Sequence, residues 1–265
     1  MSSQSLPQPL SDQGLESIQL VATDVDGTLT QGGKMTAQLL ADLVRLQKAG
    51  IDVILVTGRS AGWVSAIAHY FPVLGAIAEN GGVFCLSEGG LPAGGYRIFD
   101  GALDGTLAEH RQALGAMFAE LTDMIPRLQE SADNAFRLTD WTFDVADLTT
   151  DELQQLGDRC GTQGWGFTYS TVQCHLAKPN QTKAAAIAQL LQQQYPGLSR
   201  DAVLTIGDSP NDESLFDSDR FSCSVGVANI RHYLPRLTHW PRYVTATEAC
   251  DGFHEVVNRL LAVCP

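Results

Sequence analysis

Short apolar segments alternate with amphipathic ones in the first part of the chain. Residues 18–23 (IQLVAT) form an apolar run with β-branched members, which predicts a strand ending at the polar cluster 24–30. Thr36 then precedes apolar residues spaced by three and four positions, and Gly50 follows them, so we predict a helix capped by Thr36 and stopped at Gly50. The apolar positions of this helix are Leu39, Leu40, Leu43, Val44 and Leu46.

Two further strands follow with the same pattern. Residues 51–57 (IDVILVT) are nearly all apolar, and residues 75–79 (GAIAE) precede a turn at residues 80–82. Between them, Ser60 can cap a helix that reaches Tyr70. Strands with no polar side are typical of a parallel sheet covered by helices on both faces. We therefore predict an α/β fold with a doubly wound, mostly parallel, Rossmann-like sheet.

The middle of the chain has a different pattern. Residues 87–96 form a loop segment containing Gly and Pro, and the segments after it mix strands and helices without regular alternation. We predict strands at 97–99, 136–145, 166–169 and 173–176, and helices at 107–124 and 150–160. These elements predict an inserted α+β domain.

The pattern of the core resumes near residue 182. We predict a helix over 182–194 behind Thr182, strands at 202–206 and 222–225, and a C-terminal helix over 247–263. The predicted domains are a core of residues 17–86 and 177–265, an insert of residues 87–176, and a flexible leader of residues 1–16.

Charge and composition limit the partners of this chain. Its 265 residues include 17 Lys and Arg against 30 Asp and Glu, a formal net charge of −13. This excess of acid argues against nucleic-acid binding through overall positive charge. No apolar segment approaches the ~20 residues of a membrane-spanning helix, and the polar N-terminus lacks the features of a secretory signal. We therefore expect no nucleic-acid partner and no membrane association.

The cysteines point to a reducing compartment. They are scattered without C-x-x-C spacing, which argues against a disulfide scaffold and a structural zinc site. We expect free thiols in a cytoplasmic protein. The cysteines are Cys85, Cys160, Cys174, Cys223, Cys250 and Cys264.

Polar side chains follow the predicted core strands at the points where the strands end. They are Asp24, Asp26, Thr57, Gly58, Arg59, Asp208, Asn211 and Asp212, and Lys183 opens a helix. Because ligands of open parallel sheets bind at the carboxyl ends of the strands, we expect these groups to converge at one edge. Crowded carboxylates raise one another's pKa unless a cation neutralises them, and an oxygen-only set suits Mg²⁺ better than zinc.

Four segments resemble the sequence motifs of the haloacid dehalogenase superfamily phosphatases. They are DVDGTLT (residues 24–30), TGR (57–59), Lys183 and GDSPND (207–212), in the order of the family. The resemblance covers residues 18–86 and about 178 to the C-terminus. Any one motif is weak evidence, whereas the ordered set is highly specific.

The resemblance implies a role for each motif residue. Asp24 is expected to be the nucleophile that forms an aspartyl-phosphate, and Asp26 the general acid for the leaving alcohol and then the base for water. Thr57 and Lys183 are expected to hold the phosphoryl oxygens. The expected Mg²⁺ ligands are Asp24, Asp208, Asp212 and the backbone carbonyl of Asp26. The expected substrate-binding set also includes the backbone amides of Gly27 and Gly58 and the side chains of Arg59 and Asn211.

Two features narrow the expected branch of the family. Dehalogenase members lack the second acid because a halide leaves without a proton, so Asp26 indicates phosphate esters. The α+β insert resembles the type IIB caps of the Cof-like and sugar-phosphatase branch, with sucrose and mannosyl-3-phosphoglycerate phosphatases as relatives. Such a cap is expected to close over the substrate and exclude water.

Several residues admit two interpretations. Lys178 lies five residues from Lys183, and the helix-opening position favours Lys183 as the phosphate-binding lysine. Arg59 suits substrate contact and a structural role equally. His175 lies beside Cys174, but no further ligand at suitable spacing accompanies them, so a core or strand-edge histidine is favoured over a metal site.

We therefore predict a Mg²⁺-dependent phosphatase that acts on a small phosphorylated metabolite, with a sugar phosphate or phosphoglycerate-type ester favoured. A phosphomutase or phosphotransferase on the same scaffold stays open, since it differs only in the acceptor of the phosphoryl group. A non-catalytic sensor of a phosphoryl ligand is a further alternative. A monomer or weak homodimer is expected.

Overall fold

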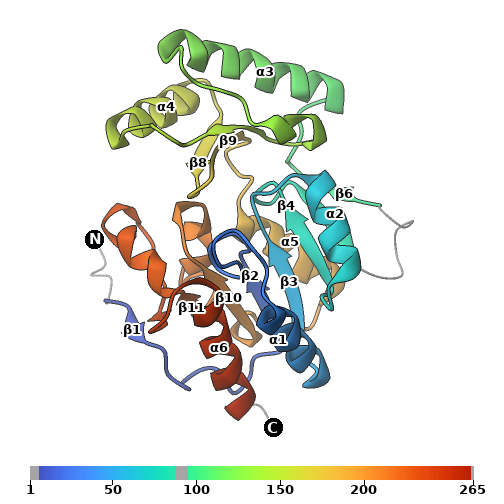
Figure 1. The fold of residues 1–265 in the computed structure, drawn as a ribbon. Helices are drawn as coiled ribbons and strands as arrows, with labels where there is room; N and C mark the ends of the chain where they lie inside the picture. Colours follow the sequence, from blue (N-terminus) through green and yellow to red (C-terminus); the bar gives the residue numbers. More distant parts are fainter. Residues whose placement is uncertain (1–5, 87–94, 264–265) are drawn as a thin grey trace.

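The computed structural model describes residues 6–86 and 95–263. Two parts stack in space: a large sheet flanked by helices, and a smaller α+β cap above it (Figure 1). The loop segment expected at residues 87–96 lies mostly outside the described residues, as does Cys264. No helix in the described ranges is long and apolar enough to cross a membrane.

The core sheet has nine strands, and the strands from β1 to β4 in its spatial order run parallel. The last two strands are antiparallel additions at one edge. In spatial order the strands are β1 (Gln8–Pro9), β12 (Tyr243–Val244), β11 (Cys223–Gly226), β10 (Val203–Gly207), β2 (Leu20–Thr23), β3 (Asp52–Val56), β4 (Gly75–Ala78), β5 (Val83–Leu86) and β6 (Arg97–Ile98). The predicted doubly wound, mostly parallel α/β fold is confirmed.

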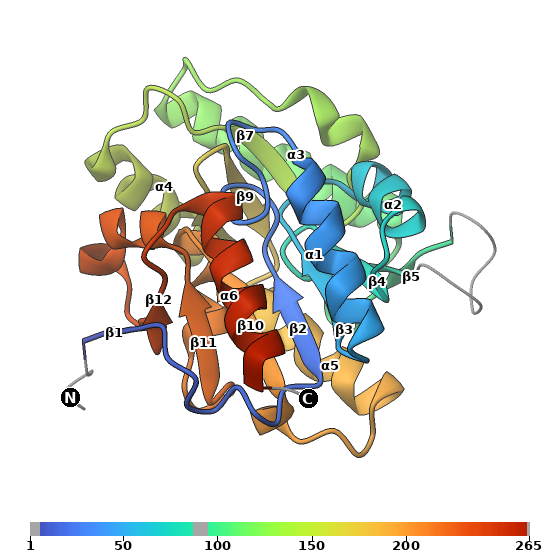
Figure 2. The ribbon, with the colours of Figure 1, turned by 60° about the horizontal axis from the view of Figure 1, so that its bottom comes forward.

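Helices cover both faces of this sheet because its central strands are apolar on both sides. On one face α1 (Ala37–Lys48), α2 (Ala61–Tyr70) and α6 (Ala249–Val263) pack into a cluster with side chains such as Val21 and Val53. On the other face α5 (Lys183–Gln194) and the 3₁₀ segment η3 (Pro210–Phe216) pack against Leu20, Ala22 and their neighbours. Figure 2 shows α1 and α6 crossing in front of the sheet. Alternate residues of one strand thus enter different cores.

The cap contains a three-stranded antiparallel sheet in the order β7 (Trp141–Asp144), β9 (Gln173–Ala177), β8 (Gly166–Tyr169). Helices α3 (Leu107–Met124) and α4 (Thr150–Thr162) lie over this sheet on the side away from the core (Figure 1). A third apolar cluster, which includes Leu114, Phe143 and Leu156, joins these elements. The cap therefore has a core of its own.

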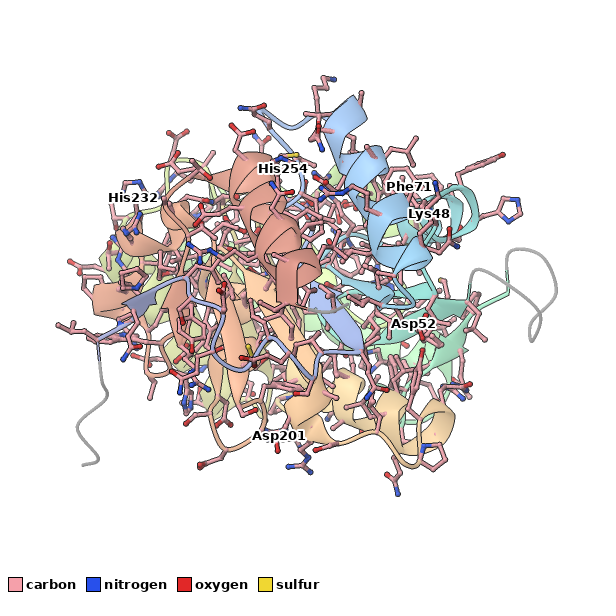
Figure 3. All side chains as sticks on the ribbon, turned by 90° about the horizontal axis from the view of Figure 1, so that it is seen from below. Lys48, Asp52, Phe71, Asp201, His232 and His254 are labelled. Atoms are coloured by element: carbon pink, nitrogen blue, oxygen red, sulfur yellow. The ribbon has the colours of Figure 1, made fainter. Side chains whose placement is uncertain are left out.

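The carboxyl ends of the core strands face the cap, and their amino ends form the opposite end of the molecule. Figure 3 views that opposite end, where Asp52 opens β3 and Asp201 lies before β10. Tyr195 donates to Asp52 Oδ2 there at 2.7 Å. The polar residues that follow β2, β3 and β10 consequently lie on the side of the sheet that the cap covers.

Some elements differ from the sequence-based prediction. The strand predicted over 136–145 is restricted to β7, and residues Ala132–Phe136 form the 3₁₀ segment η1. The residues just before β7 do not join the strand, because the backbone N–H groups of Leu138 and Thr139 donate to the carboxylate of Glu79 in the core instead of to a neighbouring strand. β6, which was expected in the insert, pairs with β5 in the core sheet.

The N-terminal segment also differs from the flexible leader that was expected. Among residues 6–16, Gln8 and Pro9 pair with Tyr243 and Val244 and so extend the core sheet. Leu10 and Leu15 are buried in the same apolar cluster as α6. The sequence did not predict this packing, because the segment is short and mostly polar. Two leucines do not form a hydrophobic period from which a strand or helix can be predicted.

Replacing Leu15 by alanine is expected to lower the free energy of unfolding by about 2–5 kcal/mol, since the side chain is fully buried and its loss leaves a cavity. The matched control is Leu6→Ala, because Leu6 is 75% exposed and its removal is expected to change stability by less than about 0.5 kcal/mol. Urea unfolding of both variants measures the difference. Equal, small effects would show that the segment does not pack as described.

Candidate active site

Strand register brings the acidic residues of two distant segments together. Thr23 at the end of β2 is opposite Ile206 of β10 and Leu55 of β3. Asp24 therefore leaves the sheet beside Asp208, although 184 positions separate them in the sequence. Carboxylate oxygens of Asp24, Asp208 and Asp212 lie within 4.8 Å of one another, and all three residues are buried.

Lys183 lies at the centre of this acidic group. Its Nζ is 2.5 Å from Asp24 Oδ1 and 2.6 Å from Asp212 Oδ1, and its side chain is fully buried. The position follows from the sequence, because Thr182 caps α5 and thereby aims the first residue of that helix at the sheet edge. Lys178, the alternative lysine, instead pairs with the exposed Asp104. Three carboxylates and one ammonium leave the group with excess negative charge.

Burial changes the acidity of this group. Burial raises the pKa of Asp24 to about 7 against the opposing effect of Lys183, and the neighbouring Asp212 adds to the rise. Burial, followed by Asp24 and Asp212, raises the pKa of Asp208 well above its usual value. Burial would lower the pKa of Lys183, but Asp212 and Asp24 together raise it. The ammonium of Lys183 is therefore held charged, while Asp24 and Asp208 resist full ionisation.

Asp208 is fixed by three groups from other segments. Thr28 donates to its Oδ1 at 3.2 Å, and Asn229 donates to its Oδ2 at 2.7 Å. Gly27 lies directly against the carboxylate: its φ is +85°, and a Cβ there would come within 2.5 Å of Asp208 Oδ2. Glycine is thus required at position 27 for the close approach of this loop. Asn229 was not predicted, although it follows β11 and the strand-end rule would have found it.

Asp26 points away from the acidic group. Arg59 donates to both of its carboxylate oxygens, at 2.8 Å from Nε and 2.7 Å from Nη2. The side chain of Asp26 is consequently not among the grouped carboxylates. The role of its backbone carbonyl as a metal ligand stays a prediction. For Arg59, the structure shows the ion-pairing role and leaves substrate contact as a prediction.

The loop after β3 contributes the next groups. Thr57 is buried, and its Oγ1 accepts from Arg59 N at 3.2 Å. Thr57 and Gly58 border a narrow cavity together with Asp24, Asp26 and Asn211. Arg137 of the cap donates to Gly58 O at 2.9 Å, so this loop is also a contact between cap and core. Every residue of the predicted site except Gly27 and Lys183 belongs to the acidic group or lines this cavity.

Glu79 was missed as an important residue. It is fully buried at the turn after β4, where its carboxylate accepts from the backbone N–H of Ala61, Leu138 and Thr139 and from Thr139 Oγ1. It therefore caps α2 in place of Ser60, which makes no such side-chain bond. Burial raises the pKa of Glu79 to about 7, and the charge of Asp140 adds to this rise. Glu79 joins the core to the segment leading into β7.

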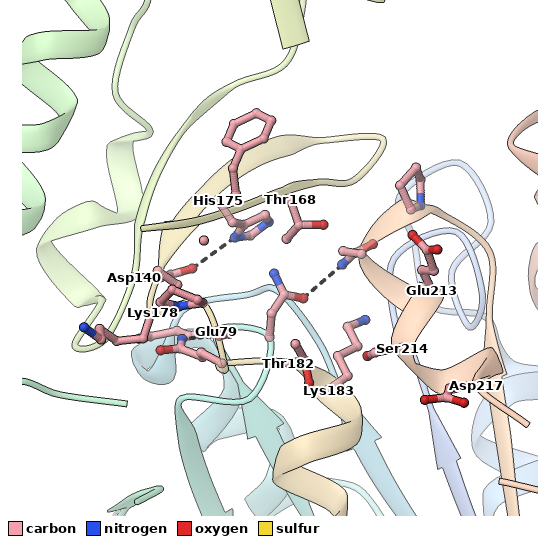
Figure 4. A pocket seen from close by; sticks show the side chains of 18 of the residues that line it. Glu79, Asp140, Thr168, His175, Lys178, Thr182, Lys183, Glu213, Ser214 and Asp217 are labelled. Carbon is pink, nitrogen blue, oxygen red and sulfur yellow. Dashed lines mark hydrogen bonds and ion pairs between the residues drawn. The ribbon is translucent and has the colours of Figure 1, made fainter. Parts of the chain in front are cut away.

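His175 lies where the sequence placed it, but its contact with the core was not predicted. It is buried on β9, as a core or strand-edge histidine would be, and its Nδ1 is 3.0 Å from Asp140 Oδ2. Its ring also reaches across to the core, where a Cβ on Gly58 would meet it. His175 and Asn211 line both the narrow cavity and a neighbouring cavity of about 340 Å³ between the cap and the core (Figure 4). Among the residues that the structure describes, His175 does not belong to any group of three or more metal-ligating side chains.

The acidic group has the properties of a divalent cation site. Its donors are all carboxylate oxygens, the ligands that Mg²⁺ prefers. Asp24 Oδ2 is buried without a hydrogen-bond partner among the described residues, so one oxygen is available for a ligand. A divalent cation would balance the excess negative charge that Lys183 leaves. The residues present therefore fit a bound Mg²⁺.

Comparison with known proteins identifies the family. The model of the haloacid dehalogenase-like hydrolases matches residues 21–90 and 118–256. The chain therefore belongs to the haloacid dehalogenase-like hydrolase family, as its four motifs predicted.

Individual relatives agree with this assignment. The chain is 28% identical over 248 residues to phosphoglycolate phosphatase 1 of Saccharolobus solfataricus, covering 92% of this chain and 96% of that protein. Sucrose-phosphatase of Synechocystis superposes with a TM-score of 0.67 at 18% identity, covering 92% of this chain and 98% of that one. A sugar phosphatase of subclass IIB superposes with a TM-score of 0.64 at 14% identity, covering 92% and 99%. At these identities the two structures establish the fold, and the expected type IIB architecture is confirmed.

Replacing Lys183 by methionine is expected to destabilise the metal-free protein by about 3–5 kcal/mol at neutral pH, because it leaves buried carboxylates without their cation. The matched control is Lys178→Met, which removes a lysine paired with an exposed carboxylate and is expected to change stability little. Urea unfolding in a chelator distinguishes the two. Equal destabilisation by both variants would contradict the central position of Lys183.

Proposed function

We propose that this chain is a Mg²⁺-dependent phosphatase that hydrolyses a small phosphorylated metabolite through an aspartyl-phosphate. The observation that carries the proposal is the buried Asp24 carboxylate beside Lys183, with Asp208 and Asp212 as its neighbours. The family assignment and the phosphoglycolate phosphatase and sucrose-phosphatase relatives support a phosphatase. A sugar phosphate or a phosphoglycerate-type ester is the favoured substrate.

Each residue has a distinct task in this proposal. Asp24 attacks phosphorus and displaces the alcohol, which forms the aspartyl-phosphate, and water then releases phosphate and restores the carboxylate. Lys183 and Thr57 hold phosphoryl oxygens, with help from the backbone amides of Gly27 and Gly58. Asn211 and Arg59 complete the proposed binding set.

Asp24, Asp208 and Asp212 are the proposed Mg²⁺ ligands, together with the backbone carbonyl of Asp26. Bound Mg²⁺ would supply positive charge that offsets the repulsion between a carboxylate nucleophile and a phosphate ester. Lys183 alone cannot do so, because two carboxylates already share its charge.

Asp26 is the proposed acid and base, and the structure places a condition on this role. Arg59 occupies both of its carboxylate oxygens, so neither can donate a proton to a leaving oxygen in this arrangement. Asp26 must therefore separate from Arg59 before it acts. An incoming phosphate can draw Arg59 away, since the guanidinium binds phosphate as well as carboxylate in a bidentate manner.

The cap is proposed to exclude water and select the leaving group. It lies between β6 and about residue 176, since β6 and the segment of residues 8–15 belong to the core. Its contact with the core at Gly58 borders the narrow cavity that the proposed nucleophile also lines. A cytoplasmic location, the absence of nucleic-acid and membrane partners, and a monomeric or weakly dimeric state stay predictions.

Replacing Asp24 by asparagine is expected to abolish Mg²⁺-dependent phosphate release from an aryl phosphate, because the amide is not a nucleophile. The control is Asp201→Asn, an exposed aspartate at the far end of the sheet, which is expected to keep wild-type activity. Wild-type turnover that needs a second hydroxyl compound as acceptor would instead indicate a phosphotransferase. Tight binding of a phosphorylated ligand without turnover would indicate a sensor.

Replacing Asp26 by asparagine is expected to lower kcat about 10²–10⁴-fold for an alkyl phosphate, since proton transfer to the leaving oxygen is lost. The loss is expected to be smaller for an aryl phosphate, whose phenolate leaves without a proton. Steady-state rates with both esters give the comparison. Equal losses with the two esters would argue against Asp26 as the acid.

Mg²⁺ at about 100 times its Kd is expected to raise the free energy of unfolding by about 2.7 kcal/mol. Removal of the ion with a chelator should reverse the gain. Asp208→Asn is expected to lose most of the effect, whereas Asp201→Asn should retain it. Thermal unfolding with and without Mg²⁺ measures the shift, and an equal gain in both variants would place the ion elsewhere.

A further inference from the structure

Gly58 adjoins two buried side chains whose polar atoms lie close to one point. A Cβ on Gly58 would be 2.9 Å from His175 Nε2 and 3.2 Å from Asn80 Nδ2. His175 is 2% exposed and Asn80 is 4% exposed. The two nitrogen atoms are therefore no more than about 6 Å apart. Both residues line the same cavity between cap and core, so a single small group held there between the two atoms can bond to both. One side chain belongs to the cap and the other to the core.

Asn80 presents a hydrogen-bond donor that lacks a partner. Its Nδ2 is buried and makes no hydrogen bond within the described part of the chain. The orientation of the amide is set by Asn211, whose Nδ2 donates to Asn80 Oδ1 at 3.0 Å. Asn211 is oriented in turn by Ser209, which donates to its Oδ1 at 2.7 Å. A buried donor without a partner costs free energy, so a ligand that accepts from it gains affinity.

His175 presents an acceptor. Asp140 is paired with Arg137 at 3.0 Å, and although burial opposes it, Arg137 lowers the pKa of Asp140. Because this carboxylate accepts, the hydrogen of His175 lies on Nδ1, which faces Asp140 (Figure 4). Burial lowers the pKa of His175, against the effect of Asp140 and with that of Arg137 and Lys183, so the ring is neutral. Nε2 therefore carries a lone pair, and the described hydrogen bonds leave it unused.

The cavity beside these atoms can hold a small leaving group. Its volume is about 340 Å³, within the usual range for small-molecule sites. Asn80, His175 and Lys183 all line it, so it adjoins the proposed phosphate position. Thr168 of β8 faces the same space (Figure 4).

We propose that Asn80 Nδ2 and His175 Nε2 form a hydroxyl-binding pair, in which the amide donates to and the imidazole accepts from one hydroxyl of the substrate's leaving group. A hydroxyl matches this pair because its single oxygen atom both donates and accepts hydrogen bonds. The pair favours esters that carry a free hydroxyl over esters of the same size without one. This proposal rests on the proposed phosphatase function and specifies its substrate class.

The test compares two esters with the same carbon skeleton, glycerol 1-phosphate and propyl phosphate, on the full chain with Mg²⁺. The wild type is expected to prefer glycerol 1-phosphate in kcat/KM. His175→Phe keeps the ring shape without the acceptor and is expected to reduce this preference about tenfold, the value of one hydrogen bond. Asn80→Asp removes the donor and is expected to reduce it as well.

Two further variants separate hydrogen bonding from packing. His175→Gln retains a side-chain acceptor and is expected to restore part of the preference. His110→Phe makes the same substitution at another buried histidine of the cap, whose Nε2 is bonded to Thr139 O at 3.0 Å, and is expected to leave the preference unchanged. If His175→Phe fails to fold, His175→Gln and Asn80→Asp are compared with the wild type instead. An unchanged preference for glycerol 1-phosphate in both variants would contradict the proposal.

Nitrogen-15 NMR of the imidazole tests the same inference without turnover. A neutral His175 ring with its hydrogen on Nδ1 is expected at pH 7. A ring protonated on Nε2, or a preference that survives His175→Phe, would overturn the proposal. Failure of every ester to release phosphate would refute the phosphatase function instead. The NMR measurement of the imidazole tautomer would then still show whether Nε2 can accept a hydrogen bond.

Discussion

The whole active site depends on an unbalanced buried charge. Asp24, Asp208 and Asp212 are buried together, and a single ammonium, Lys183, pairs with Asp24 and Asp212. Such a group is costly to fold without a further cation. In the proposed function this cost is also the source of the chemistry, because it favours binding of a divalent ion and then of a phosphoryl group. Lys183 pairs with Asp24 and Asp212 and so holds the nucleophile of the proposed reaction in place. In the proposed function, the interaction between this lysine and the acids links stability to metal binding and catalysis.

The parallel sheet makes that arrangement possible. Strand register places the residues after β2, β3 and β10 at one edge, so groups from remote parts of the chain meet without any long loop. Two residues then bring the loop after β2 close to Asp208. Gly27 allows its loop to touch the Asp208 carboxylate, and Asn229 ties that carboxylate to Gly27 O as well. Helix α5 begins at the edge itself, which is why its first residue and no later one reaches the acids.

The cap is part of the site as well as its cover. Arg137 binds the backbone of Gly58, and Glu79 of the core accepts from the backbone of Leu138 and Thr139. The charged chain from Arg137 through Asp140 to His175 lies in the same contact region, so the orientation of one imidazole depends on the correct seating of the cap. In the proposed function, these hydrogen bonds couple the position of the cap to the recognition of the substrate.

The sequence alone determined the core of this protein, because apolar runs predict buried strands and the motifs follow those strands directly. Nearly every core element was predicted on that basis. So was the meeting of Asp24, Asp208 and Asp212 with Lys183 at one edge of the sheet. Only the tertiary structure decided the partners: Arg59 binds Asp26, Glu79 caps α2, and His175 of the cap approaches Gly58 of the core. It also decided that residues 8–15 join the core, where a flexible leader was expected. Periodicity reports which face of an element is buried, whereas the partner of a polar side chain depends on contacts between segments that are distant in sequence, and no local pattern encodes those contacts.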